Sequence, residues 1–339
     1  MIKVKPIVIV FILLFVAILT IPSVLVLPFS HEKASGKIAE AEPKQDWEAL
    51  LKEASPVDVS VYRSANDKVE TVPLEEYIVG VVASEMPAEF EEEALKAQSL
   101  AARTFIVRQL MADQKPALLK GADVGDNQGY QVYTNDKELR EKWGANYNKY
   151  IEKIRKSVYE TRGQIVVYDN QPITASYFST SNGYTENSEA YWTNPFPYLK
   201  SVESPWDTES KEFTAETVIP VAQFEEKLGV TVSSSEIGEI ESRTPGKRVE
   251  KVKIGDKELT GREIRDKLSL RSADFSWVRE GDDIVITTKG YGHGVGMSQY
   301  GANGMAKEGK TYEDIIKYYY QGVAISKADH LLEQYVVKK

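Results

Sequence analysis

The hydrophobic pattern divides the chain into a short apolar segment and a long mixed region. Residues 7–29 form an uncharged run of 23 residues, and about 20 residues of helix cross a bilayer core. Two lysines and no acidic residue precede this run, which is typical of an exported chain. We therefore expect residues 1–6 in the cytoplasm, 7–29 as an uncleaved membrane anchor and the rest outside. A cleaved signal peptide is the alternative, because Ala39-Glu40-Ala41 has the small-x-small form of a cleavage site.

After the anchor, polar residues 30–56 predict a stalk with a short helix around Trp47–Lys52, and folded structure is expected from Val57. Period-two alternation in 57–62 predicts a strand, with 69–72 as its hairpin partner. Beyond these strands, apolar spacing and end signals predict helices at 73–86, 88–111, 151–159 and 311–320 and a strand at 165–168. The Ile and Val residues of 73–86 leave a strand as an alternative there.

The predicted fold class is α+β, with one ectodomain (57–339) that contains a substrate cleft. Between Trp206 and Gly290 the sequence becomes ordinary charged α/β sequence, so we interpret residues 207–289 as an inserted, peripheral lobe. Its expected elements are helices 221–228 and 261–268 and strands 249–254 and 283–288. The strand order does not follow from the sequence.

Composition removes several classes of function. The net charge is −9, which argues against a non-specific nucleic-acid binder. The chain has no cysteine and three histidines, so disulfides, thiolate metal sites and cysteine nucleophiles are excluded. We expect no metal and no cofactor.

Glu85 is the first candidate for chemistry. A helical period places it on the same face as the apolar residues Val81 and Tyr77, at the carboxyl end of the predicted helix. Burial and the negative end of the helix dipole both raise the pKa of a carboxyl, as a general acid requires. The alternative is an exposed glutamate in a loop before Pro87.

Two later segments have the composition of a binding site. Residues 177–192 are rich in hydroxyl, amide and aromatic side chains, including Ser179, Ser181 and Asn182, which is typical of a carbohydrate groove. A turn-rich surface sheet is the alternative there. Tyr198 and Lys200 follow, and they add a phenol and a cation.

Residues 290–302 alternate glycine with other residues and match neither the dinucleotide fingerprint nor the phosphate-binding Walker loop. This spacing predicts backbone held close to another chain or a ligand. His293 and Gln299 are the candidate binding residues of this segment.

Four motifs together carry a family resemblance: EYIVGVVASEMP, LKAQSLAARTF, ASYFSTSNGYTENSEAYW and GYGHGVGMSQYGA. In this order, and between about Val57 and Gly322, the chain resembles the stage II sporulation protein D family of bacterial peptidoglycan lytic transglycosylases.

The resemblance implies cleavage of the MurNAc–GlcNAc bond in glycan strands that a partner amidase has stripped of peptides. The product would have a 1,6-anhydro-MurNAc end, and the enzyme would thin the septal wall during engulfment in sporulation. The family's catalytic glutamate matches Glu85, and its supporting positions match Arg103, Tyr198 and Lys200. Some relatives bind zinc through Cys and His; this chain has no cysteine, so we do not carry the metal over.

This reaction needs one carboxyl, whereas glycoside hydrolases usually need two. Arg103, 18 residues after Glu85, is expected to anchor the site or to pair with Glu85 after proton transfer. Permanent pairing would lower the pKa of Glu85 and weaken it as an acid.

Two alternatives come from other classes of function. One is a non-catalytic glycan-binding module that recruits or activates a cell-wall amidase. The other is an amidase or esterase with Ser179 or Ser181 as nucleophile and His293 as base, although no Gly-x-Ser-x-Gly elbow is present.

Overall fold

The computed structural model describes residues 45–112, 119–192, 194–233 and 236–338. The predicted cytoplasmic segment, membrane anchor and signal-peptidase motif (residues 1–6, 7–29 and 39–41) lie outside these residues. In the described part, no helix is both long and apolar enough to cross a membrane. Residues Trp47–Lys339 form one compact unit.

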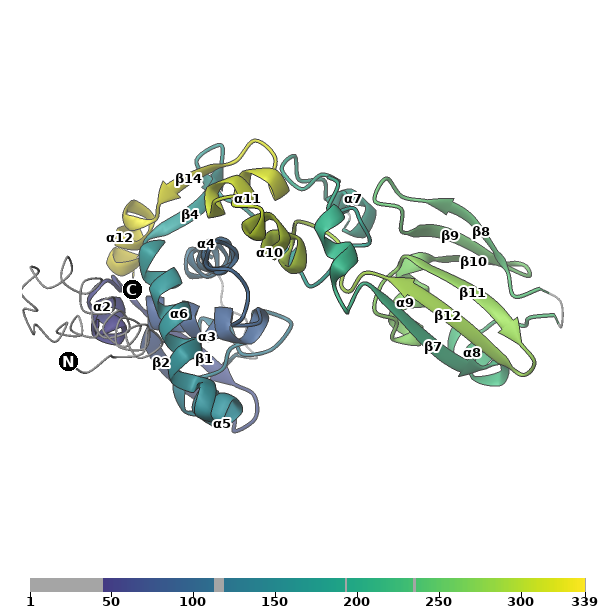
Figure 1. The fold of residues 1–339 in the computed structure, drawn as a ribbon, viewed down its shortest axis with the longest axis horizontal. Helices are drawn as coiled ribbons and strands as arrows, with labels where there is room; N and C mark the ends of the chain where they lie inside the picture. The colour runs from purple at the N-terminus through teal and green to yellow at the C-terminus, as the bar shows by residue number, and fades with distance from the viewer. Residues whose placement is uncertain (1–44, 113–118, 193, 234–235, 339) are drawn as a thin grey trace, which may run out of the picture. The chain divides into compact units, whose positions relative to one another are not determined.

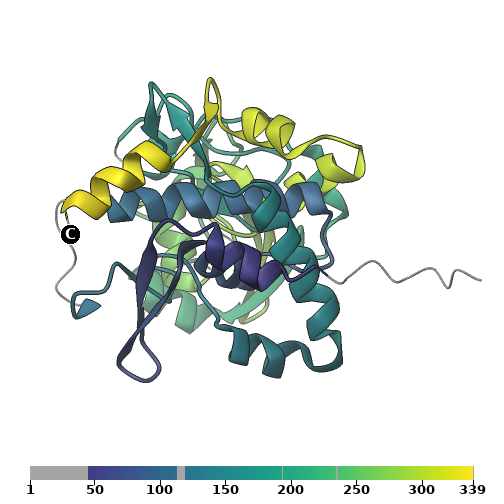
Figure 2. The same cartoon turned by 90° about the vertical axis from the view of Figure 1, so that its left-hand side faces the viewer.

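The unit has an α+β fold, as predicted, and helix α4 (Glu92–Leu110) lies at the centre of its main hydrophobic core. Ala94, Ala97 and Ala101 on α4 are fully buried. Because their side chains are small, neighbouring elements can pack closely against this helix. Figure 1 shows α4 end-on, surrounded by α3, α6, α10, α11 and strand β4, and Figure 2 shows it from the side as the long blue helix.

Helix α3 (Leu74–Glu85) carries Glu85 as its last residue. It ends there because Met86 precedes Pro87 and takes an extended conformation, with φ −129° and ψ 138°. The alternative of a strand in this region is wrong.

The other helices of the main core are α2 (Trp47–Glu53), α5 (Asp136–Trp143), α6 (Tyr147–Glu160), α7 (Ser188–Tyr191), α10 (Gln299–Lys307), α11 (Tyr312–Tyr319) and α12 (Asp329–Lys338), with 3-10 turns at Gly144–Asn146 and Pro205–Glu209. Folded structure begins earlier than the expected Val57. Leu51 on α2 is fully buried, and the Trp47 ring contacts Tyr159 at a centroid distance of 5.5 Å. The helix at the end of the predicted stalk is therefore part of the core.

Two small sheets border this core. Strands β1 (Asp58–Arg63) and β2 (Lys68–Pro73) form the predicted antiparallel hairpin, and β3 (Val124–Gly125) adds parallel to β1. Strand β4 (Gln164–Tyr168) pairs antiparallel with β5 (Gln171–Pro172) and with β14 (Ala324–Lys327).

Residues 214–289, here called the 214–289 segment, have a hydrophobic cluster of their own around Phe224, Ile264 and Phe275. One sheet has the order β11-β12-β7 and the other β10-β9-β8. The elements are β7 (Thr214–Pro220), α8 (Val221–Leu228), β8 (Glu239–Arg243), β9 (Val249–Ile254), β10 (Lys257–Thr260), α9 (Gly261–Leu268), β11 (Phe275–Glu280) and β12 (Asp283–Lys289). These elements lie together in Figure 1, and both helices have the predicted bounds.

The two motif segments at 177–192 and 290–302 lie beside each other. Strand β6 (Tyr177–Phe178) pairs parallel with β13 (Met297–Ser298), and a bridge joins Thr180 to Tyr291. A Cβ at Gly296, where φ is +82°, would lie 2.0 Å from the carbonyl oxygen of Ser176. The prediction of a close backbone approach at these glycines is therefore confirmed, but the neighbour is a segment of the same chain and not another chain or a ligand.

Candidate functional site

A cavity of about 1270 Å³ lies where the end of α3 meets the β6 and β13 segments. Its lining residues come from several parts of the chain. Most of them are residues 83–89, residues 128–132, Lys142, Trp143 and Tyr150 on α5 and α6, residues 174–179 with Tyr191 and Trp192, and residues 291–293 with Gln299 and Tyr300. Phe105, Glu212 and Arg265 also line it. Of the predicted site residues, Glu85, Ser179, His293 and Gln299 line this cavity.

The Glu85 carboxyl is partly buried in the cavity wall and has two donors beside it. Its Oε1 accepts a hydrogen bond from the backbone N–H of Val132 at 2.9 Å, and the Tyr177 hydroxyl is close enough to stabilise the carboxylate as a donor. Burial raises the pKa of Glu85, and these two donors oppose that rise. Within the described residues no cation forms an ion pair with Glu85. The alternative of an exposed loop glutamate is wrong.

Tyr177 is itself oriented by a chain of hydrogen bonds. The Tyr77 hydroxyl donates to Oε1 of Gln131 at 3.2 Å, and Nε2 of Gln131 donates to the Tyr177 oxygen at 3.3 Å. A hydroxyl has one proton, so the proton of Tyr177 is available to Glu85. The sequence marked Tyr77 as sharing a face with Glu85, but nothing in the sequence around Gln131 indicated its contact.

His293 is an aromatic member of the cavity wall. Its ring lies 5.4–5.8 Å from the rings of Phe178, Tyr191 and Trp192. Its Nδ1 accepts a hydrogen bond from the backbone N–H of Val295, at 3.0 Å. Burial, followed by the positive charges of nearby arginines, lowers the pKa of His293 to about 3. The imidazole is therefore neutral at neutral pH.

The amidase or esterase alternative requires a serine beside His293, and the structure contradicts it for both candidates. The Oγ of Ser179 contacts Thr180 at 3.2 Å, and that of Ser181 donates to buried Asp207 at 2.9 Å. The side chain within reach of His293 Nε2 is Ser176, at 3.4 Å. His293 therefore forms a hydrogen bond with neither predicted nucleophile.

Ser181 and Asn182 lie outside the cavity wall and have structural contacts. Asp207 accepts hydrogen bonds from the backbone and the side chain of Ser181, so this turn is held inside the main core. Nδ2 of Asn182 donates to the Gly246 carbonyl at 2.9 Å and to Asp274 at 2.8 Å, both in the 214–289 segment. Both residues are buried, so the alternative of a turn-rich surface sheet is wrong for them.

Arg103 does not pair with Glu85. Its guanidinium is fully buried and bonds both oxygens of Glu75, with 2.7 Å between Nη2 and Oε2. It also donates to the carbonyl groups of Val158 and Gln164. Arg103 thus joins α4 to α3, and it is not among the residues that line the cavity.

Tyr198 and Lys200 also lie outside the cavity wall. The Tyr198 hydroxyl accepts a hydrogen bond from the backbone N–H of Thr174, a cavity residue, at 3.0 Å. Lys200 forms an ion pair with Glu189 at 2.7 Å. Tyr198 therefore supports the cavity wall through Thr174. The charge of Lys200 is balanced by Glu189 outside that wall.

Aromatic side chains give the cavity flat apolar faces. Trp143 and Tyr150 meet edge to face at 5.6 Å, as do Tyr191 and Trp192 at 5.7 Å. Tyr130, Tyr291 and Tyr300 also line the cavity. Flat faces with hydroxyl and amide groups between them are suited to sugar rings. In the described part of the chain, no three His, Asp or Glu side chains form a metal-binding cluster.

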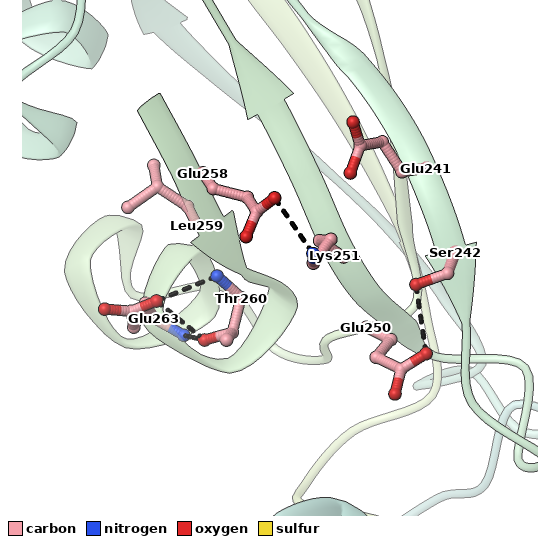
Figure 3. Close-up of a pocket in the computed structure, with 8 residues that line it drawn as sticks. All are labelled: Glu241, Ser242, Glu250, Lys251, Glu258, Leu259, Thr260 and Glu263. Atoms are coloured by element: carbon pink, nitrogen blue, oxygen red, sulfur yellow. Dashed lines mark hydrogen bonds and ion pairs between the residues drawn. The ribbon is translucent and has the colours of Figure 1, made fainter. Parts of the chain in front are cut away.

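A second cavity, of about 490 Å³, lies on strands β8–β10 and α9 (Figure 3). Its polar groups bond one another: Lys251 with Glu258 at 2.9 Å, Ser242 with Glu250 at 3.0 Å, and Thr260 with Glu263. None of the described residues that line it is aromatic. The first cavity is therefore the candidate site.

Known proteins resemble the chain over nearly its whole length. The stage II sporulation protein family model matches residues 62–168. Stage II sporulation protein D of Bacillus subtilis is 54% identical over 330 residues, 95% of this chain and 96% of that protein. The Bacillus amyloliquefaciens protein of the same name is 53% identical, over 99% of this chain and 100% of its own length. An amidase enhancer of Bacillus subtilis is 30% identical, over 73% of this chain and 40% of that protein. The chain therefore belongs to the stage II sporulation protein D family.

Proposed function

We propose that the protein is a lytic transglycosylase that cleaves the MurNAc–GlcNAc bond of peptide-free glycan strands. The observation that carries this proposal is Glu85, a partly buried carboxyl with a raised pKa in the wall of a large aromatic cavity. A carboxyl with a raised pKa keeps its proton to a higher pH than an ordinary glutamate, as a general acid requires.

In the first step, Glu85 gives its proton to the glycosidic oxygen as the bond from that oxygen to C1 of MurNAc breaks. The 6-hydroxyl of the same MurNAc then attacks C1, and its proton passes to the Glu85 carboxylate. The product has a 1,6-anhydro ring, and Glu85 is protonated again. The substrate supplies the nucleophile, so no second catalytic carboxylate is needed.

The other cavity carboxylates favour this one-carboxyl mechanism. Glu89 accepts a hydrogen bond from Tyr150 at 2.5 Å, which lowers the pKa of Glu89. Glu212 pairs with Arg271. Glu89 therefore favours its charged form and Glu212 is engaged in an ion pair, so Glu85, whose pKa is raised, is the cavity carboxyl best suited to donate a proton.

The setting we propose is the cell wall during sporulation, where the enzyme would thin the septal wall in engulfment. The names of the relatives support this setting. Residues 7–29 would anchor the chain as a single membrane span, with its N-terminus in the cytoplasm and the ectodomain outside. A cell-wall amidase would act first and supply the stripped strands.

The test is to incubate the full-length protein with peptide-free glycan strands and to identify the product ends by mass spectrometry. We expect ends lighter by one water than hydrolytic ends, and none from Glu85→Gln. Ordinary reducing ends would instead indicate a hydrolase and contradict the one-carboxyl mechanism.

One alternative has its own support: a glycan-binding module that activates an amidase. The relative named amidase enhancer favours it. If wild-type protein and Glu85→Gln both bind glycan, release no product and stimulate a cell-wall amidase equally, this alternative replaces the enzyme.

A further inference from the structure

Of the described residues of the 214–289 segment, Arg265 on α9 is the one that lines the cavity. Its Nε is buried and makes no hydrogen bond. No carboxylate of the described residues lies within ion-pair distance of it. Arg265 itself is half-buried in the cavity wall and its charge has no counter-ion there, so a ligand that brings an anion to it would gain binding free energy.

The other charged groups that line the cavity form hydrogen bonds or an ion pair within the protein. Each has a partner on the protein: Glu85 with the backbone N–H of Val132, Glu89 with Tyr150, Glu212 with Arg271, and Lys142 with the carbonyl oxygen of Ala83 at 3.5 Å. Among the described lining residues, Arg265 is thus the cation left over for a ligand.

The surroundings of Arg265 are suited to a sugar that carries an acid. Its positive charge is close enough to lower the pKa of His293. The neutral His293 ring is packed against Tyr191 and Trp192. Arg248, which is also near His293, lies 3.8 Å from Glu186 and donates to the Tyr184 carbonyl. A sugar ring on these aromatic side chains would therefore have a free guanidinium beside it.

We propose that Arg265 binds the lactyl carboxylate of a muramic acid whose peptide has been removed; this rests on the proposed function. When an amidase hydrolyses the bond between the lactyl group and the peptide, the lactyl group ends in a carboxylate. Before that cleavage, the same position is a neutral amide joined to a peptide. A guanidinium matches a carboxylate with two parallel hydrogen bonds, which an amide cannot accept. Arg265 would thus select stripped strands.

The test measures binding by calorimetry to full-length protein that carries Glu85→Gln, so that no sugar is cleaved. The two ligands are a tetrasaccharide of alternating GlcNAc and MurNAc with free lactyl carboxylates, and the same tetrasaccharide with its lactyl groups converted to methylamides. We expect the carboxylate form to bind at least about tenfold more tightly. Adding Arg265→Gln should abolish that preference.

The matched control is Lys267→Gln, which removes the same charge from an exposed residue of the same helix, outside the cavity wall. It should leave the preference unchanged. Arg265→Lys should keep a reduced preference, because it retains the charge but loses the planar fork. It also serves as the test if Arg265→Gln fails to fold.

A carboxylate preference that survives Arg265→Gln would overturn the proposal, and so would failure of the Glu85→Gln protein to bind either sugar. The proposed function is judged separately, by the products of the protein with Glu85 intact. Absence of cleavage would reject the transglycosylase, while the ratio of affinities would still decide the role of Arg265.

Discussion

The Tyr177 hydroxyl is one of the groups that set how readily Glu85 loses its proton, after burial and the backbone N–H of Val132. Tyr177→Phe removes a donor that stabilises the carboxylate, so the pKa of Glu85 should rise further. Because the acid must be protonated at the start of the reaction, the alkaline limb of kcat/KM should move up by about one pH unit. The measurement is the pH profile of anhydro-product formation from peptide-free strands.

Tyr150→Phe is the matched control, since Tyr150 lies in the same cavity but donates to Glu89. Its alkaline limb should not move. An unmoved limb in Tyr177→Phe would mean that Tyr177 has no role in setting the acidity of Glu85.

The burial of Glu85 could be predicted from the sequence, because the apolar residues on its face of the helix and the nearby Pro87 are local signals. The sequence was less informative for the partners of Glu85. Val132, whose backbone N–H bonds Glu85, lies 47 residues further along the chain, in a region without a clear period. A contact of this kind depends on the folded arrangement of the chain, which cannot be predicted from the helical period of a single segment.

Between elements, the buried pair of Arg103 and Glu75 joins α4 to α3, and both side chains are fully buried. Arg103→Ala would leave the Glu75 carboxylate without its cation and two carbonyl groups without a donor. We expect a loss of about 3–5 kcal/mol in the free energy of unfolding, measured by denaturant unfolding. The double variant Glu75→Leu with Arg103→Met should lose less. An Arg103→Ala protein with wild-type stability and no activity would instead indicate a direct role in the site.

Glu76 lies at the junction of α3, α6 and α2, 3.4 Å from Arg155. Burial raises the pKa of Glu76 to about 7. Because the folded pKa is above the ordinary value, the charged form is disfavoured in the fold, and this group costs stability as the pH rises from about 4.5 to 7. Glu76→Gln should therefore be more stable than wild type at pH 8, by roughly 1–3 kcal/mol.

The stability difference between Glu76→Gln and wild type should shrink towards pH 5, where both side chains are neutral. In the variant, Arg155 would retain its ion pairs with Glu48, at 2.9 Å in the wild-type structure, and with Asp136, at 3.4 Å. Urea unfolding at pH 5 and pH 8 makes the comparison. A variant that is less stable than wild type at pH 8 would show that the pairing with Arg155 outweighs the cost of burial.

At the scale of the whole molecule, the sequence predicted the local elements of the 214–289 segment well. Helix α8 ends at Gly229, which takes a left-handed conformation, and α9 begins with a capping box at Thr260. These signals lie within a few residues of the helix ends. The attachment of the segment was not predicted, because Asn182 contacts Gly246 and Asp274, which are 64 and 92 residues away.

This attachment leads to the last prediction. The Asn182 amide holds the turn at Gly246 and the Asp274 carboxylate, so it should help to keep Arg265 in place at the cavity. Asn182→Ala should weaken binding of the carboxylate tetrasaccharide to Glu85→Gln protein by about tenfold, and should affect the methylamide form less. Asn182→Asp should weaken it further, because it loses the donor and places a second carboxylate beside Asp274. Neither change touches Glu85, so the alkaline limb of the pH profile should stay where it is in protein that retains Glu85. Equal weakening for both sugars would mean that Asn182 supports the cavity as a whole and does not act through Arg265.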